Sequence, residues 1–196
     1  MEKKDIRKQI FAKRAEINAE FVEQQSNEIC RKILAMPQFQ LASCIYVYMD
    51  YKKEASTRPI IEEAWRLGKR VAAPKVFGED MRYFYIRSYD DVAPGYFGIP
   101  EPDENRDLEQ AAREDALLLV PGVAFDRERH RCGYGKGFYD RYLSSHPRHA
   151  TIAMALDFQI VEEVPFDKYD ICPQILVTPT AVYGQGEQDQ KGRIDQ

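Results

Sequence analysis

A glycine-rich stretch at residues 130–143, HRCGYGKGFYDRYL, contains the residue types that most directly suggest chemistry. Gly133, Gly135 and Gly137 alternate with other residues, and Lys136 lies between the last two. Glycines adopt positive φ at low cost and let backbone N–H groups approach a ligand closely. The stretch leads into a predicted helix over 137–145, whose N-terminal N–H groups would favour an anion. It is therefore either a phosphate-binding loop or only a tight strand-to-helix connection.

Two familiar phosphate-binding motifs do not match this loop. A Walker A motif needs glycine five residues before its Gly-Lys pair and Ser or Thr after it, but His130 and Gly137 stand there. A dinucleotide fingerprint needs a third glycine where Phe138 stands. Asp140, in the first helical turn, would either cap the helix or hold a cation against a bound phosphate. Charge-assisted hydrogen bonds to an anion are available from Arg131, Lys136 and Arg141.

Length and composition limit the class of protein. The 196 residues predict a single domain over residues 1–183 and a disordered, polar tail over residues 184–196. The net charge of −4 argues against a general nucleic-acid-binding protein. The N-terminal stretch MEKKDIRKQI has no signal-peptide core, and no apolar run is long enough for a membrane span. The four cysteines form no CxxC pair, which predicts free thiols and a cytoplasmic protein.

Hydrophobic periodicity predicts alternating helices and strands. Residues 116–120, ALLLV, are typical of a strand buried on both faces of a parallel sheet. The pattern as a whole predicts an α/β sheet covered by helices on both faces. Predicted helices are 3–36 with a break near Asn18, 57–68, 108–114 as one or two turns, and 137–145. Predicted strands are 43–50, 70–74, 81–87, 116–120, 151–156, 175–178 and the short edge 181–183, and residues 90–107 are predicted to be loop.

Several segments, in order, resemble the 5-formyltetrahydrofolate cyclo-ligase family, also called methenyltetrahydrofolate synthetases. They are KKDIRKQIFAKR, YVYMDYKKEAST, GYFGIPEP, PGVAFD with RCGYGKGFYDRYL, and LDFQ…YD…ILVTP, which span roughly residues 3–178. The resemblance implies a three-layer α/β/α sandwich with a mostly parallel, Rossmann-like sheet, of the NagB/RpiA/CoA-transferase-like architecture, and an N-terminal helical segment. It also implies a ligase that uses ATP and Mg²⁺ to cyclise 5-formyltetrahydrofolate to 5,10-methenyltetrahydrofolate, releasing ADP and phosphate. A monomer that binds these small molecules, with no nucleic acid or membrane partner, is expected.

The resemblance also implies roles for individual residues. Lys136, Arg131 and Tyr134 would be the catalytic residues, because phosphoryl transfer depends on positioning and charge neutralisation. Asp140 and Asp170 match the magnesium-associated acids. The ATP-binding residues would be Lys3, Lys4, Arg7, Arg131, Cys132, Gly133, Tyr134, Gly135, Lys136, Gly137, Phe138 and Tyr139. The folate-binding residues would be Met49, Glu54, Phe97, Tyr134, Gly135, Lys136, Gly137 and Phe138.

Without the family, several of these residues have simpler interpretations. The basic residues of the first helix would be a solvated face, Glu54 a surface residue, Met49 part of the core and Asp170 a turn residue. The sequence also departs from the family at Cys132, where an aliphatic residue is usual, and at Phe138, where tyrosine is common. Tyr169 likewise precedes Asp170 where histidine is commoner. His130 has no family role, and a solvated loop histidine is the default.

Two other functions are compatible with the sequence. One is a related α/β enzyme acting on sugar phosphates or CoA esters, which would need no ATP. The other is a folate- or nucleotide-binding protein without turnover. The lysine, glycines and acids gathered in one segment favour catalysis over storage.

Overall fold

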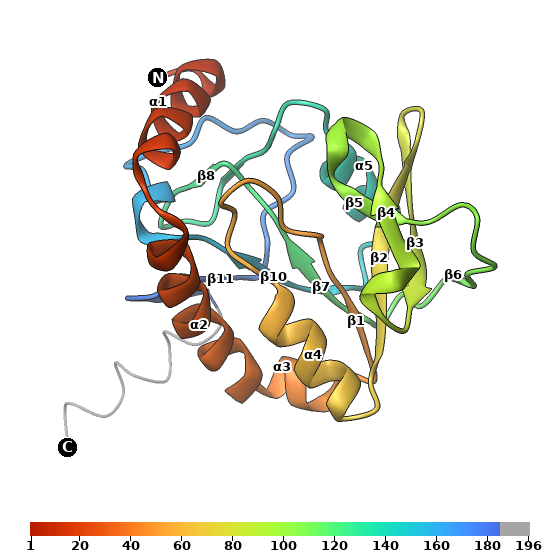
Figure 1. Cartoon of the computed structure of the whole chain (residues 1–196). Coiled ribbons are helices and arrows are strands. Elements are labelled where there is room, and N and C mark those ends of the chain that lie inside the picture. The colour runs from red at the N-terminus through yellow and green to blue at the C-terminus, as the bar shows by residue number, and fades with distance from the viewer. Residues whose placement is uncertain (185–196) are drawn as a thin grey trace.

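An eight-stranded sheet forms the centre of the computed structural model, which describes residues 1–184 (Figure 1). Its strands, in spatial order, are β12 (Val182–Gly184), β11 (Ile175–Val177), β10 (Ala150–Met154), β7 (Leu117–Val120), β1 (Cys44–Tyr46), β2 (Arg70–Phe77), β3 (Asp80–Ile86) and β6 (Gln110–Ala111). The five strands β11, β10, β7, β1 and β2 run parallel, and β12, β3 and β6 are antiparallel additions at the two edges. The predicted mostly parallel sheet is confirmed.

Strand β7 lies in the middle of the sheet, and every residue in it is apolar and buried. It pairs in parallel with β1 on one side and β10 on the other. Its alternate side chains enter two different cores: Leu117 and Leu119 face one, and Leu118 and Val120 face the other. A strand in that position must be hydrophobic on both faces, because helices cover each side of the sheet.

Helices cover both faces of the sheet, as predicted. The helices α2 (Ala19–Ala35), α3 (Pro37–Leu41) and α4 (Arg58–Arg66) pack on one face, and α5 (Phe138–Ser145) packs on the other. The N-terminal helix α1 (Lys3–Glu16) lies to one side of the sheet, against the hairpin of β8 (Ala124–Phe125) and β9 (Arg131–Cys132) (Figure 1). Ile6 and Ile10 of α1 are buried in that contact.

The predicted helix over residues 3–36 is two helices with different neighbours. The Asn18 side chain accepts a hydrogen bond from the Phe21 amide at 2.8 Å and so caps the start of α2. Asparagine satisfies a free N–H group in this position, which favours a new helix start over continuation. Pro37 follows the end of α2 and occupies the first turn of α3, where its missing N–H costs nothing.

Two predictions for residues 90–114 were wrong. Residues 90–107 were predicted to be loop, but β4 (Val92–Pro94) and β5 (Pro100–Pro102) pair there as a short ribbon. Residues 108–114 were predicted to be helical turns, but β6 extends the sheet beside β3 and buries Ala111. The open edge of β3 offers unpaired backbone groups, and pairing with them outweighs the weak helical pattern.

The hairpin β8–β9 separates β7 from the glycine loop, so the loop follows a hairpin rather than a parallel strand directly. The four cysteines are free, as predicted, and three of them are buried: Cys30, Cys44 and Cys132. The helices of residues 1–184 are too short or too polar to traverse a lipid bilayer. Gly184, the first residue of the predicted tail, is the last residue of β12. Residues 185–196 of that tail lie outside the described residues.

Candidate active site

The glycine loop, residues 133–137, joins β9 to α5. Gly135 and Gly137 adopt left-handed backbone conformations, with φ of 94° and 68°, whereas the expected positive φ at Gly133 is not found. Gly137 is also the N-cap of α5. A left-handed residue directly before a helix start turns the chain sharply, which leaves the first N–H groups of α5 accessible to an anion.

Each glycine of the loop is approached by an arginine, and this explains why side chains are absent there. An added Cβ atom would lie in or close to a guanidinium group in all three cases. Measured from the added Cβ, Arg131 Nη1 would lie at 2.9 Å at Gly133, Arg7 Cζ and Nη2 at 3.4 Å at Gly135, and Arg141 Nη1 at 2.9 Å at Gly137. The loop is therefore surrounded by fixed positive charge, the setting that a polyphosphate requires.

We expect Gly135→Ala to lower the affinity for a nucleotide in addition to lowering the stability of the fold. Its φ of 94° strains any side chain, at a cost of about 1–3 kcal/mol, and the new methyl group would contact Arg7. Gly68, which follows α4, provides a matched control because it has a φ of 71° and no atom near an added Cβ. Both alanine variants should unfold at lower urea concentration, but only Gly135→Ala should raise the dissociation constant for an ATP analogue in calorimetry. Equal nucleotide affinity in the two variants would contradict the loop's proposed role.

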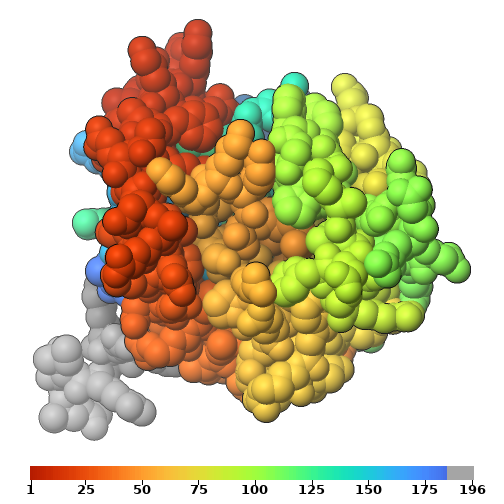
Figure 2. All heavy atoms as spheres, viewed as in Figure 1, coloured from red at the N-terminus to blue at the C-terminus, as the bar shows by residue number. Residues whose placement is uncertain are grey.

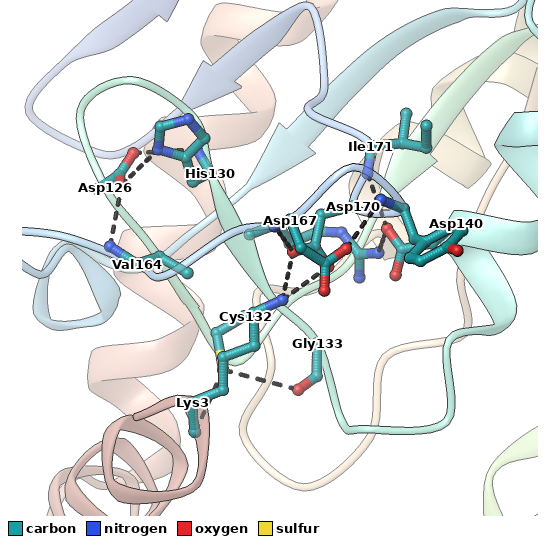
Figure 3. Close-up of polar contacts among 12 residues, drawn as sticks. Lys3, Asp126, His130, Cys132, Gly133, Asp140, Val164, Asp167, Asp170 and Ile171 are labelled. Atoms are coloured by element: carbon teal, nitrogen blue, oxygen red, sulfur yellow. Dashed lines mark hydrogen bonds and ion pairs between the residues drawn. The ribbon is translucent and has the colours of Figure 1, made fainter. Parts of the chain in front are cut away.

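Helix α1 brings one of the three predicted basic residues, Arg7, to the loop and a second, Lys3, to Asp170. Arg7 Nε donates to the Gly133 carbonyl at 2.7 Å, and Lys3 Nζ donates to the Asp170 carboxylate at 2.6 Å. Lys4 is exposed, with no hydrogen bond or ion pair to any residue of the described chain. Cys132 is fully buried, and its thiol contacts the carbonyls of Lys3 and Gly133, at 3.5 and 3.8 Å (Figure 3).

The two predicted magnesium-associated acids lie next to each other (Figure 3). Asp140 Oδ1 accepts from Arg131 Nη2 at 2.7 Å and from the Ile171 amide at 3.1 Å, which places it beside Asp170. Burial opposes the ionisation of Asp170, but the Lys3 ammonium and the Asp167 amide hold its pKa below the ordinary value. Mg²⁺ commonly binds one or two carboxylates and completes its shell with water and phosphate oxygens. The two carboxylates fit that donor set, although no cluster of three or more metal-binding side chains occurs in residues 1–184.

The Lys3–Asp170 pair should make stability depend on pH in a defined direction. Because the folded-state pKa of Asp170 is lowered, its contribution is complete above its unfolded pKa of about 3.9 and is lost as the pH falls through the folded value. We expect Lys3→Met to lower the unfolding free energy at pH 7 by on the order of 1 kcal/mol. This difference from wild type should shrink between pH 4 and pH 2. Urea unfolding at both ends of this range tests the pair, with Lys13→Met as the control, and a constant difference would contradict it.

Glu54 is not the surface glutamate that its sequence context suggests. Its Oε1 accepts a hydrogen bond from the Tyr134 hydroxyl, and its Oε2 accepts from the Tyr51 amide at 2.9 Å. Burial raises the pKa of Glu54, while the Tyr134 hydroxyl, the Tyr51 amide and the Arg14 guanidinium act in the opposite direction. The structure therefore joins the predicted folate-binding acid to the glycine loop through one tyrosine.

The remaining predicted residues, Met49, Phe97 and Lys136, lie in three different environments. Met49 is buried in the core beneath the segment that carries Glu54. Phe97 is 70% exposed in a left-handed conformation, and its ring lies 4.4 Å from that of Tyr96, which in turn faces Phe138. Lys136 is exposed, and its ammonium has no partner within the described chain. Only Lys136 among these residues is a free cation at the loop.

Two residues of α1 that were not predicted from the sequence contact Tyr134. Phe11 stacks on the Tyr134 ring with centroids 6.1 Å apart, and Arg14 Nη1 donates to the Tyr134 hydroxyl at 2.9 Å. The helical spacing held a signal, because Arg14 follows Arg7 by seven residues and so lies on the same side of the helix. His130 was also misjudged: its Nδ1 pairs with Asp126 at 2.8 Å and its ring stacks on Phe166, so it is part of the structure rather than solvated.

An open hollow of about 910 Å³ borders the loop on the side of α5. Its lining includes Gly137, Phe138, Asp140, Arg141 and Asp170, together with residues 79–83 and 110–114. Glu54 and Tyr134 do not line it. The hollow thus borders the loop at Gly137, next to Asp140 and Asp170, and the Tyr134–Glu54 contact lies outside it.

A family model for 5-formyltetrahydrofolate cyclo-ligases matches residues 1–179, nearly all of the described chain. The chain belongs to this family. A probable 5-formyltetrahydrofolate cyclo-ligase from Schizosaccharomyces pombe is 32% identical over 82% of this chain and 87% of its own. The 5-formyltetrahydrofolate cyclo-ligase of Escherichia coli is 29% identical over 89% of this chain and 98% of its own.

The fold of the cyclo-ligase family is confirmed by a solved structure as well. The NMR structure of the Aquifex aeolicus 5,10-methenyltetrahydrofolate synthetase superposes with a TM-score of 0.81 at 32% identity, covering 95% of this chain and 94% of that one. The cyclo-ligase resemblance drawn from five sequence segments is therefore confirmed over residues 1–179, and the protein is an enzyme of the cyclo-ligase family.

Proposed function

We propose that this enzyme cyclises 5-formyltetrahydrofolate to 5,10-methenyltetrahydrofolate and consumes ATP in doing so. One observation carries the proposal: the glycine loop contacts a half-buried carboxylate, Glu54, through Tyr134, and its glycines are approached by the guanidinium groups of Arg7, Arg131 and Arg141. A pterin offers an amino-pyrimidinone edge that a carboxylate accepts hydrogen bonds from, and a triphosphate requires the cations. A loop that contacts both ligands would bring their reacting ends together.

The proposed reaction has two steps. The formyl oxygen attacks the γ-phosphorus of ATP, so that the bond from phosphorus to ADP breaks and a formyl phosphate ester forms. The N10 arylamine then attacks the formyl carbon, the carbon–oxygen bond breaks, phosphate leaves, and the N10 proton is released. No nucleophilic side chain is needed, since phosphoryl transfer relies on positioning and on neutralising charge.

Individual residues of the chain would have different roles in binding and catalysis. Lys136, with its free ammonium, would neutralise the transferring phosphoryl group, and Arg131 would fix the loop through its contact with Asp140. Tyr134 would orient the folate together with Glu54 and Met49, and Phe97 would stack on it from the neighbouring ribbon. The phosphates of ATP would be bound by Lys3, Lys4, Arg7 and the backbone of residues 131–139. Asp140 and Asp170 would hold Mg²⁺, which supplies charge neutralisation on the phosphates when bound.

Incubation with 5-formyltetrahydrofolate, ATP and Mg²⁺ tests the proposal. The methenyl absorbance should rise only when all three are present. We expect the active species to be a monomer whose catalytic domain spans residues 1–183. A related enzyme of sugar phosphates or CoA esters would give no ATP-dependent product. A storage protein would bind the folate in calorimetry without turnover. Either outcome would overturn the proposed function.

A further inference from the structure

Arg14, in the last turn of α1, is a buried arginine with unmet hydrogen-bonding capacity. It is only 7% exposed. Nη1 donates to the Tyr134 hydroxyl, whereas Nε and Nη2 are buried and have no hydrogen-bond partner within residues 1–184. Removing a guanidinium from water is costly unless an anion lies nearby. The side chain therefore needs a carboxylate to stabilise it.

Glu54 is the carboxylate that Arg14 reaches, through a relay of hydrogen bonds. The Tyr134 hydroxyl accepts from Arg14 and donates its own proton to Glu54 Oε1. The Tyr51 amide holds Oε2 of the same carboxylate. Arg14, Tyr134 and Glu54 come from α1, the glycine loop and the segment after β1, so the relay connects three separate parts of the chain.

The segment that carries Glu54 is also fastened directly to the end of α1. Lys53 Nζ donates to the carbonyls of Arg14, Ala15 and Ile17, at 3.3, 3.1 and 2.6 Å. Lys53 itself adopts a left-handed conformation, with a φ of 61°. In Figure 2 this orange segment lies against the red N-terminal helix. The end of α1 thus fixes both the backbone and the side chain of the candidate folate-binding acid.

Besides Arg14, the Tyr134 hydroxyl favours the charged form of Glu54 through its hydrogen bond to Oε1. Asp50 opposes its charge, and the neighbouring phenols are those of Tyr48, Tyr134 and Tyr139. The Lys53 ammonium is engaged by the carbonyls at the end of α1. Arg14 is the cation that counters burial at this carboxylate.

We propose that Arg14 is a positioning residue of the folate site, which through Tyr134 keeps Glu54 an oriented carboxylate for the amino-pyrimidinone edge. This inference rests on the proposed function, because it concerns the same substrate. A protonated or rotated Glu54 would lose an acceptor for that edge. Arg14 would therefore set folate affinity without touching the reacting atoms.

Folate binding measured against pH tests this role. An adjacent cation lowers a carboxyl pKa by about 1–3 units, so Arg14→Gln should weaken binding of 5-formyltetrahydrofolate by about tenfold at pH 7. The loss relative to wild type should shrink as the pH rises, because a higher pH restores the carboxylate. Arg14→Lys should keep most of the affinity, and affinity for an ATP analogue should change less than twofold in both variants. In a Glu54→Gln background, Arg14→Gln should add little.

Other results would overturn the inference. A loss that is the same at every pH, or that persists fully in the Glu54→Gln background, would make Arg14 only a structural residue. If Arg14→Gln does not fold, Tyr134→Phe breaks the same relay and leaves the cation in place. Its loss of folate affinity should also shrink with rising pH, and a pH-independent loss would contradict the relay. A wild-type chain that binds no folate would instead refute the proposed function.

Discussion

Lys136→Ala should lower the turnover of 5-formyltetrahydrofolate by a factor of ten to a thousand, equivalent to roughly 1.4–4 kcal/mol of transition-state stabilisation. The Lys136 ammonium is exposed at the glycine loop and has no partner within residues 1–184. Its loss should therefore leave stability nearly unchanged. The neighbouring guanidinium groups are engaged by Gly133, Asp140 and Glu79, which leaves this lysine free to follow a moving phosphoryl group. Steady-state kinetics with saturating ATP gives the measurement.

Lys13→Ala is the matched control, because Lys13 is an exposed lysine of α1 that makes no hydrogen bond or ion pair within the described chain. It should retain wild-type turnover, and both variants should show the wild-type urea midpoint. Unchanged turnover in Lys136→Ala would remove this residue from the catalytic machinery. A similar loss in both variants would point to a general effect of surface charge on ATP encounter.

Glu54→Gln should weaken folate binding and leave ATP binding almost untouched. The substitution removes the charge while keeping an oxygen that can accept from Tyr134, so the relay geometry is preserved. Hydrogen bonds to charged groups contribute about 1.5–3 kcal/mol, which corresponds to a loss of roughly 10- to 150-fold in affinity. Calorimetry with each ligand separately measures the two effects.

Glu162→Gln provides the control for this experiment, since Glu162 is an exposed glutamate outside the site. It should bind both ligands as wild type does. An equal loss of folate and ATP affinity in Glu54→Gln would show that Glu54 supports the loop as a whole instead of binding the pterin.

The parts of the fold that sequence predicted well are those with a strong local pattern. The apolar run of β7 predicts a buried strand, and the proline and glycine that bracket α4 predict the two ends of a helix. The parts that failed depend on partners distant in sequence. Residues 110–111 form a strand only because β3 offers an open edge. Short strands such as β4 and β5 likewise exist only as a pair.

In the candidate site, too, the contacts between residues distant in sequence were the ones that could not be predicted. Glycine spacing indicated the anion-binding loop, and the resemblance implied that Lys3, Arg7, Asp140, Asp170 and Glu54 belong near it. Neither could reveal that Arg14 reaches Glu54 through Tyr134, because that contact joins residues 80 and 120 positions apart. Nor did the sequence show that arginines occupy the space beside each glycine. Such contacts depend on how α1 packs against the β8–β9 hairpin.

Transfer of oxygen from the formyl group to phosphate tests the central claim most directly. 5-Formyltetrahydrofolate labelled with ¹⁸O in the formyl group would be incubated with the enzyme, ATP and Mg²⁺, and the released phosphate analysed by mass spectrometry. Phosphorylation of the formyl oxygen predicts one labelled oxygen in each phosphate released, with one methenyl product formed for each ADP. Methenyl formation with unlabelled phosphate would contradict phosphorylation of the formyl oxygen at this loop.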